Sequence, residues 1–246
     1  MLEPTLPVVA VLGTAAFLVG LSKGGLGGGL GPFITILVAL VTGPSRAIGV
    51  LLPILMVADV AAVWVHRHDW DRGIVLRLLP GAVVGVAVTS LFLGSVDDRA
   101  VELVLAGLSL VFVVYRLLEP RLRGLRMEVG PGLAVAAGTA SGVASTIAHA
   151  GAPPVVAYLL AARTPPVTYV ATTAVFFTVV NWLKVPGYLA AGLLDTSALR
   201  LAPLAVLLVP GVLVGRWLVR RIDARVFERV VLVLLVVGAV YLLVDR

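Results

Sequence analysis

The feature that most constrains this chain is an apolar stretch of 36 residues, from Leu6 to Val41, whose single charge is Lys23. A second stretch, from Val129 to Ala162, carries no charge other than titratable His149. One helix of 36 residues would be about 54 Å long at 1.5 Å per residue, whereas the hydrocarbon core of a bilayer is about 30 Å thick. Each stretch is therefore predicted to form two helices or half-helices joined by a break.

Glycine and proline mark both breaks. The first reads Gly-Gly-Leu-Gly-Gly-Gly-Leu-Gly-Pro over residues 24–32, and the second reads His-Ala-Gly-Ala-Pro-Pro over residues 149–154. Such residues interrupt helices. Backbone groups freed from a helix survive in a membrane only where they line a cavity or pack on protein, and helix N-termini favour anions. Whether these broken hairpins cross the membrane or re-enter it stays open at the level of sequence.

The composition favours a membrane protein. Of the 246 residues, 60% are hydrophobic and 13% are charged, against about 25% charged in soluble domains. A soluble enzyme and a disordered chain are both excluded on this ground. The chain has no cysteine and three histidines, so no metal or other cofactor is expected. The net charge of +6 suits arginine-rich loops at a membrane better than nucleic acid, which is not expected as a partner.

Charged residues mark the ends of six further apolar spans. We predict them at about 47–65, 75–95, 100–118, 167–191, 201–219 and 228–244. The fold class is therefore an all-α polytopic membrane protein. Threading the chain through these spans places 13 arginines on one side and four on the other. The positive-inside rule makes the 13 cytoplasmic and both termini extracytoplasmic, in a multi-pass protein of the cell membrane.

The two halves of the chain, 1–126 and 127–246, resemble each other. Asp97-x-Arg99-x-x-Glu102 returns as Asp223-x-Arg225-x-x-Glu228, and Leu-Pro-Gly-Ala-Val-Val-Gly at 79–85 matches Val-Pro-Gly-Val-Leu-Val-Gly at 209–215. Each half holds a broken hairpin (6–42 or 129–162) and three spans, and the halves enter the membrane from opposite sides. Inverted-topology repeats with broken helices are typical of secondary transporters. Coincidence among low-complexity apolar segments is the alternative.

The chain also resembles a known family in two blocks. The first runs from Gly20 through the glycine-rich break to Pro32, then Pro-Ser-Arg-Ala-Ile-Gly at 44–49; the second combines Gly-Thr-Ala-Ser-Gly at 138–142 with residues 151–154 and 176–192. Both resemble the sulfite exporter TauE/SafE family, also called the 4-toluene sulfonate uptake permeases. The resemblance implies transport of sulfite, organosulfonates or related small anions. The sequence Ser-Thr-Ile-Ala-His at 145–149 departs from the family's glycine richness.

The candidate site residues lie at the breaks and on one helix face. Lys23 and Lys184 are the only lysines beside 17 arginines, and each falls within an apolar segment, where a charge is costly and usually functional. Asn181 shares a helix face with Lys184, and Thr173 and Tyr188 continue it. The full set of predicted substrate-binding residues is Lys23, Gly24, Gly28, Gly29, His149, Gly151, Thr173, Asn181, Lys184 and Tyr188.

Each candidate has a structural alternative. The lysines can lie in a loop or extend to the membrane interface, Thr173 and Asn181 can join helices by hydrogen bonds, and neutral His149 can simply pack. Asp59, the one carboxylate well inside a span, is the candidate for proton coupling, since burial favours its protonated form; it can instead pair with a lysine. His66, His68 and Asp69 could chelate a metal, but a solvated loop explains them better.

These observations predict a secondary transporter of small sulfur-containing anions, with proton coupling through Asp59, that works by alternating access. A passive anion channel of the same fold, a transporter of small carboxylates and a non-transporting membrane scaffold are the alternatives. An enzyme is not expected, because the sequence offers no Ser/His/Asp set with credible geometry and the glycine run contains no nucleotide-binding motif. The expected partners are a small anion and the lipid bilayer, and a homodimer is compatible with this hypothesis.

Overall fold

The computed structural model describes residues 5–25, 30–65, 67–95, 97–122, 129–194 and 202–218, with isolated positions between 233 and 244. This part of the chain is helical and contains no strand. Five of its helices, α1, α3, α4, α6 and α8, are long and apolar enough to cross a membrane. In chain order the elements are α1 (Leu6–Gly25), α2 (Gly31–Thr42), α3 (Pro44–Val65), α4 (Arg72–Leu93), α5 (Asp98–Leu122), α6 (Pro131–Ala148), α7 (Ala152–Ala161), α8 (Pro166–Ala190), the 3₁₀ helix η1 (Ala202–Leu207) and α10 (Leu208–Leu218).

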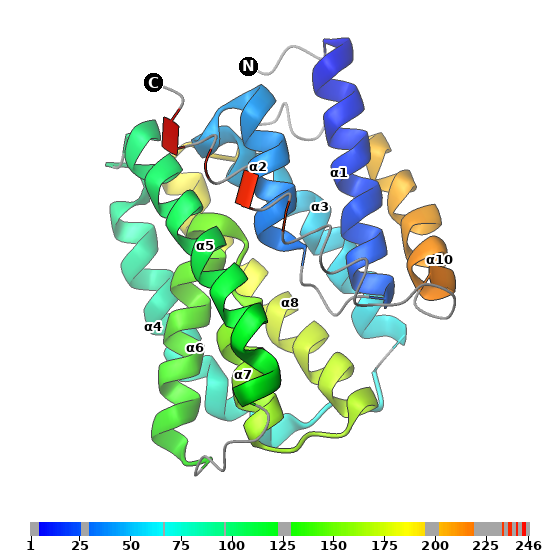
Figure 1. The fold of residues 1–246 in the computed structure, drawn as a ribbon, viewed down its shortest axis with the longest axis vertical. Coiled ribbons are helices and arrows are strands. Elements are labelled where there is room, and N and C mark those ends of the chain that lie inside the picture. Colours follow the sequence, from blue (N-terminus) through cyan, green and yellow to red (C-terminus); the bar gives the residue numbers. More distant parts are fainter. Residues whose placement is uncertain are drawn as a thin grey trace.

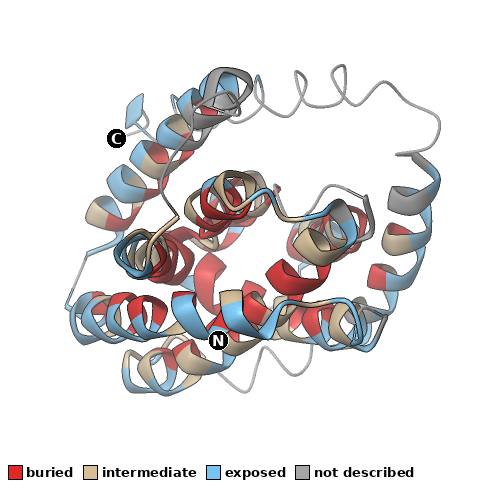
Figure 2. Cartoon of the chain, turned by 90° about the horizontal axis from the view of Figure 1, so that it is seen from below, coloured by how far each residue is buried: buried red, intermediate tan, exposed pale blue. Residues whose placement is uncertain are grey.

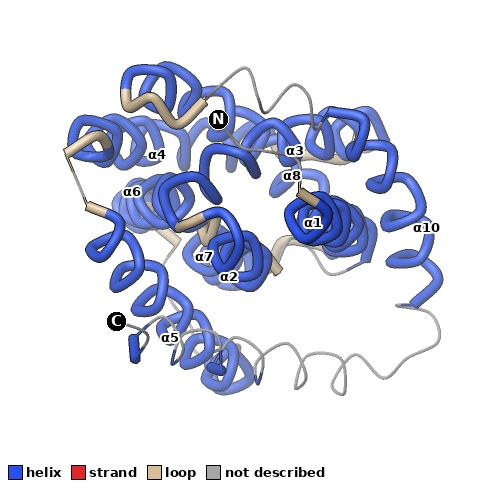
Figure 3. Tube along the Cα trace, turned by 90° about the horizontal axis from the view of Figure 1, so that it is seen from above, coloured by secondary structure: helices blue, strands red, loops and turns tan. Residues whose placement is uncertain are grey.

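Both long apolar stretches are divided into one long and one short helix. The long members, α1 and α6, have 20 and 18 residues, and the short members, α2 and α7, have 12 and 10. At 1.5 Å per residue the short helices span about 18 and 15 Å, roughly half of a 30 Å hydrocarbon core. Figure 1 places α2 in the upper half of the molecule and α7 in the lower half, and Figure 3 shows both near the centre of the surrounding helices. By length, neither α2 nor α7 can span the hydrocarbon core alone.

Local sequence explains where these helices begin and end. Proline lacks the N–H that a first helical turn leaves unpaired, and the first turns of four helices contain one: Pro32 in α2, Pro131 in α6, Pro153 in α7 and Pro166 in α8. Asp71 caps α4 by accepting a hydrogen bond from the N–H of Ile74, 2.9 Å away. His149 adopts the left-handed conformation, with φ at 51°, directly after α6, and this turn separates α6 from α7.

Glycines allow α4 and α6 to lie in close contact. A Cβ on Gly138 of α6 would collide with the carbonyl oxygen of Leu78, and a Cβ on Gly81 of α4 would collide with that of Val135. Small residues let the backbones of membrane helices approach in this way. A helix of the first half, α4, thus packs against α6, the first long helix of the second half.

A second pair, α1 and α10, packs by the same means. A Cβ on Gly20 of α1 would collide with the carbonyl oxygen of Leu208, and a Cβ on Gly211 of α10 would collide with that of Phe17. Gly211 belongs to the Val-Pro-Gly block that matches the block containing Gly81. Here a helix of the second half, α10, packs against α1, the first long helix of the first half.

The buried side chains form two main clusters that follow these pairings. One joins residues of α1, α2, α3 and α5 with Leu208 of α10 and the end of α6. The other joins residues of α4 with α6, α7 and α8. Many large apolar side chains face outward instead, among them Leu91 at 79% and Trp182 at 59% exposed, and Figure 2 shows this exposed outer surface around a buried centre. Apolar side chains exposed in such number suit contact with lipid.

The observed helices can be compared with the predicted spans. The helices α3, α4, α5 and α8 cover the spans predicted at about 47–65, 75–95, 100–118 and 167–191, and η1 with α10 covers 201–219. The span predicted at 228–244, like the second copy of the Asp-x-Arg-x-x-Glu motif, lies outside the described residues except for isolated positions.

Candidate functional site

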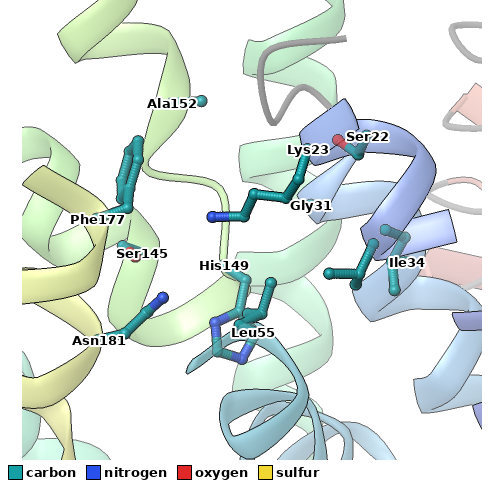
Figure 4. Close-up of a pocket in the computed structure, with 11 residues that line it drawn as sticks. Ser22, Lys23, Gly31, Ile34, Leu55, Ser145, His149, Ala152, Phe177 and Asn181 are labelled. Atoms are coloured by element: carbon teal, nitrogen blue, oxygen red, sulfur yellow. The ribbon is translucent and has the colours of Figure 1, made fainter. Parts of the chain in front are cut away.

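A cavity of about 50 Å³ lies where the two halves of the chain meet. Roughly 10–15 Å³ measured in this way holds one water molecule, so the cavity has room for a few waters or one small ion. Residues of α1, α2, α3, α6, α7 and α8 and of the break after α6 contribute to its wall (Figure 4). They are Val19, Ser22, Lys23, Gly31, Ile34, Leu55, Ser145, His149, Ala152, Phe177 and Asn181.

Both short helices begin at this cavity. Gly31, the first residue of α2, and Ala152, the first residue of α7, belong to its wall. Gly31 packs so closely on the carbonyl of His149 that a Cβ would collide with it, and Thr35 of α2 donates to the carbonyl of Ala148 at 2.9 Å. Unpaired N–H groups and the positive end of the helix dipole make such N-termini favourable for negative charge.

Lys23 and Asp59 form an ion pair beside the cavity. The Nζ of Lys23, in the last turn of α1, donates to Oδ1 of Asp59 in α3. The Lys23 side chain is 16% exposed and that of Asp59 is fully buried. Lys23 therefore presents a positive charge to the cavity while it holds the buried carboxylate behind it.

Asn181 of α8 connects this pair to the second lysine. Its Nδ2 donates to Oδ2 of Asp59 at 2.5 Å, and its Oδ1 accepts from Nζ of Lys184 at 2.8 Å. An ammonium group has only donors and a carboxylate only acceptors, so both contacts require this one orientation of the amide. Figure 4 shows the Asn181 nitrogen and the Lys23 nitrogen pointing into the same central space.

His149 completes the network. Its Nε2 lies 2.9 Å from the carbonyl oxygen of Ile48 in α3, and its Nδ1 lies 3.3 Å from Nζ of Lys184. A carbonyl can only accept, so Nε2 carries a proton and donates it. Nδ1 of the neutral ring then accepts from the Lys184 ammonium. Because both nitrogens are engaged, His149 presents carbon atoms of its ring, rather than a free nitrogen, to the cavity.

The charges of the network favour an anion. Lys23 is balanced by Asp59, whereas the partners of Lys184 in the described part of the chain, Asn181 and His149, are neutral. With both lysines protonated the group carries one net positive charge, and Asp59, Asn181 and Lys184 within it are buried. A buried charge without a counter-ion is costly, and a small anion in the neighbouring cavity would lower that cost.

Three further predicted site residues, Gly151, Thr173 and Tyr188, are described and do not belong to the cavity wall. Gly151 caps α7, and its carbonyl accepts from Ser141 at 2.7 Å. The buried hydroxyl of Tyr188 donates to the carbonyl of Thr146 at 2.6 Å. Thr173 donates at 2.7 Å to the carbonyl of Tyr169 on its own helix. Gly24 follows Lys23 in the last turn of α1, and Gly28 and Gly29 lie outside the described residues.

Two serines of the cavity wall were missed by the sequence analysis. Ser22 precedes Lys23, and its hydroxyl accepts from the N–H of Leu30, 3.3 Å away. Ser145 lies one helical turn before His149. Ser22 adjoins Lys23 in the sequence and Ser145 lies four residues before His149, and this closeness to two candidate residues was the available signal.

The described residues contain no group of three His, Asp or Glu side chains placed to hold a metal ion. His66 of the predicted His66/His68/Asp69 alternative lies outside them, while Arg67 contacts His68 at 2.9 Å and stacks 5.6 Å above the ring of Trp64. The described chain therefore presents a partly open cavity with a surplus of positive charge, lined by helices from both halves.

Comparison with known proteins agrees with this arrangement. No curated protein and no solved structure matches the chain. The family model described as "Sulfite exporter TauE/SafE" matches residues 12–242, which is nearly the whole sequence. The helices of a multi-pass membrane protein, the cavity between them and this match lead to one conclusion: the chain belongs to the sulfite exporter TauE/SafE family of membrane transporters.

Proposed function

We propose that the chain is a secondary transporter of small sulfur-containing anions, sulfite or organosulfonates, and that the central cavity is its binding site. The observation that carries this proposal is the convergence of Lys23 from the first half and Asn181 from the second half on one cavity with a surplus of positive charge. The N-termini of α2 and α7 border the same cavity, as discontinuous helices do at anion sites in transporters.

The proposed mechanism is alternating access between two inverted-topology repeats, 1–126 and 127–246. Its support is the equivalence of two helix pairs. In each pair, a glycine of one half's long opening helix (Gly20 or Gly138) packs on a carbonyl of the other half (Leu208 or Leu78). Each paired body contains helices from both halves, and the cavity lies between the bodies, where rocking would open it to either side.

Proton coupling through Asp59 belongs to the same proposal, as does a cytoplasmic location for the arginine-rich ends. Asp59 is fully buried in the middle of α3 and bonded to residues that line the cavity. In Figure 1 the α3–α4 and α7–α8 connections lie at the end of the molecule opposite the start of α1. The sequence of each connection contains an arginine. This supports extracytoplasmic termini in a cell-membrane protein.

Small carboxylates are a second candidate substrate class, on one specific observation. Lys23 and Asn181 together hold a carboxylate in this structure, that of Asp59. The same two donors could therefore accept a carboxylate from solution as well as a sulfur oxyanion.

The test measures anion flux into proteoliposomes that contain the purified, reconstituted protein. Sulfite, methanesulfonate and acetate are supplied separately, with and without a pH gradient, and accumulation against an internal pool of the same anion is recorded. We expect saturable sulfur-oxyanion uptake that an internal pool accelerates, which a channel does not do. Lys23→Met should abolish it, while Arg77→Met, which removes an exposed charge on α4, should not. If acetate alone is taken up, the substrates are small carboxylates rather than sulfur oxyanions. A conductance that does not saturate with anion concentration would contradict a carrier.

A further inference from the structure

The carboxylate of Asp59 occupies the donors that a substrate anion needs. Its Oδ1 accepts from Nζ of Lys23 and its Oδ2 accepts from Nδ2 of Asn181 at 2.5 Å. Both donors belong to residues of the cavity wall, whereas Asp59 itself is fully buried behind them. Two donors from two helices, one on each oxygen, form the arrangement that would bind an oxyanion from the cavity. In this structure the carboxylate of Asp59 thus accepts the hydrogen bonds that Lys23 and Asn181 could otherwise donate to a bound anion.

We propose that substrate and Asp59 compete for these two donors, and that Asp59 takes up one proton from water each time a substrate anion displaces it. This inference rests on the proposed function and specifies how the anion and the proton are linked. Lys23 and Asn181 pass from the internal carboxylate to the oxygens of the anion. The proton enters on Asp59 with the anion and leaves when Asp59 returns to Lys23.

The need for a proton follows from burial. A carboxylate that loses both donors without access to water is strongly destabilised in its charged form. The titratable groups that face Asp59 from the surrounding elements are Lys23 on α1, Lys184 on α8 and, beyond Lys184, His149. Lys184 already donates to Asn181 and His149, and Lys23 is taken by the anion. The displaced carboxylate is therefore left to be neutralised by a proton.

The other elements packed on α3 offer no positive charge that could replace Lys23 beside Asp59. The helices α2, α6 and η1 contain no titratable residue. The acidic and basic residues in the first turns of α5 lie at the end marked by the Ser45–Asp98 contact, and Ser45 is 14 residues, about 21 Å, from Asp59 along α3. Within the described part of the chain, Lys184 is therefore the one positive charge near Asp59 besides Lys23, and its hydrogen bonds go to Asn181 and His149 rather than to the carboxylate.

The exchange leaves the buried charge unchanged. Before binding, the group holds Lys23, Lys184 and ionised Asp59, and after binding it holds the two lysines, one monovalent anion and neutral Asp59. The net charge is one positive in both states, so the loaded and empty forms meet the same electrostatic barrier when they reorient. One monovalent anion and one proton then cross together, and no net charge moves.

The experiment measures proton uptake when the detergent-solubilised protein binds methanesulfonate. This probe stays monovalent throughout the accessible pH range, so any proton bound is bound by the protein. We expect one proton per anion for the natural chain and an apparent Kd that rises with pH, by up to about tenfold per pH unit for one linked proton. Asp59→Asn should bind with a Kd that does not change with pH and should take up no proton. Asp69→Asn, the same change in an exposed loop, should behave as the natural chain.

A second measurement needs no variant. In proteoliposomes of the natural chain, methanesulfonate uptake should follow an imposed pH gradient and should not respond to an imposed membrane potential. Binding without proton uptake, or uptake driven by the potential, would overturn the competition and leave the anion transporter intact. If neither methanesulfonate nor sulfite binds at any pH, the proposed function fails and this inference fails with it.

Discussion

The ion pair between Lys23 and Asp59 is expected to add little to the stability of the protein, whereas the loss of either partner alone is expected to cost much more. A buried ion pair adds little net stability, because removing two charges from water offsets their attraction, but removing one partner leaves the other charge exposed to an apolar interior. In the proposed function Lys23 supplies a positive charge beside the cavity, so variants of the pair should separate its effect on stability from its effect on transport.

Lys23→Met should therefore destabilise the protein strongly, by about 3–5 kcal/mol, because the buried carboxyl group of Asp59 loses its counter-ion. The double variant Lys23→Met/Asp59→Asn should recover most of the loss, since neither charge remains, yet it should not transport. Thermal unfolding in detergent measures the first effect and proteoliposome flux the second. A double variant as unstable as the single one would show that the pair is not coupled in this way.

Asn181 should matter through orientation. Asn181→Ala removes the hydrogen bond to Oδ2 of Asp59 and one of the two contacts of the Lys184 Nζ, which keeps, among the described residues, only Nδ1 of His149 at 3.3 Å. Unpaired buried groups cost about 1–3 kcal/mol each, so we expect substrate flux to fall at least about tenfold. Thr178→Ala is the matched control, because that hydroxyl bonds only to the carbonyl of Ala174 on its own helix. Equal flux in the two variants would remove Asn181 from the site.

The sequence identified the polar residues of this site better than their partners. Buried charges stand out in an apolar chain, so Lys23, Asp59, Asn181, Lys184 and His149 could all be singled out, and the structure places them in one network. Asp59 and Asn181 lie 122 residues apart. Their contact depends on the rotation of α3 and α8 about their axes, which tertiary packing sets and periodicity alone does not. Their functional roles remain predictions.

At the scale of elements, the helix contacts built on glycine should tolerate no added carbon. Gly138→Ala forces a Cβ against the carbonyl oxygen of Leu78, whereas a Cβ on Gly132, in the same helix, meets nothing within 4 Å. Gly138→Ala should separate α4 from α6 and lower the unfolding temperature and the yield of folded protein. Gly132→Ala should be neutral or slightly stabilising, because alanine favours helix more than glycine does. An unchanged unfolding temperature in Gly138→Ala would contradict the close contact.

The positions of the two breaks could be predicted from glycine and proline alone, but their asymmetry could not. Each break divides its stretch into a long and a short helix, and the short one spans about half the membrane. Where a short helix stops depends on what it packs against. The first turn of α2 rests on the carbonyl of His149, and Thr35 bonds to Ala148, contacts between distant parts of the chain that no local pattern encodes.

At the scale of the whole molecule, orientation in the membrane can be tested directly. The chain has no cysteine, so single cysteines can be introduced without a background. Asp69 and Ser95 are both exposed, one in the α3–α4 connection and one in the α4–α5 connection. A membrane-impermeant maleimide should label Ser95→Cys in intact cells and Asp69→Cys only after the membrane is opened. The reverse pattern would invert the predicted topology.

The exchange of helices between the halves affects how the protein is synthesised. The packing face of α1, with Gly20, is completed by α10, which is made roughly 180 residues later. At 5–20 residues per second that interval is about 10–40 s, during which α1 sits in the bilayer without its partner. By contrast, α4 waits only for α6, the next but one helix. The contact between α4 and α6 can therefore form well before the contact between α1 and α10, which has to wait until nearly the whole chain is made.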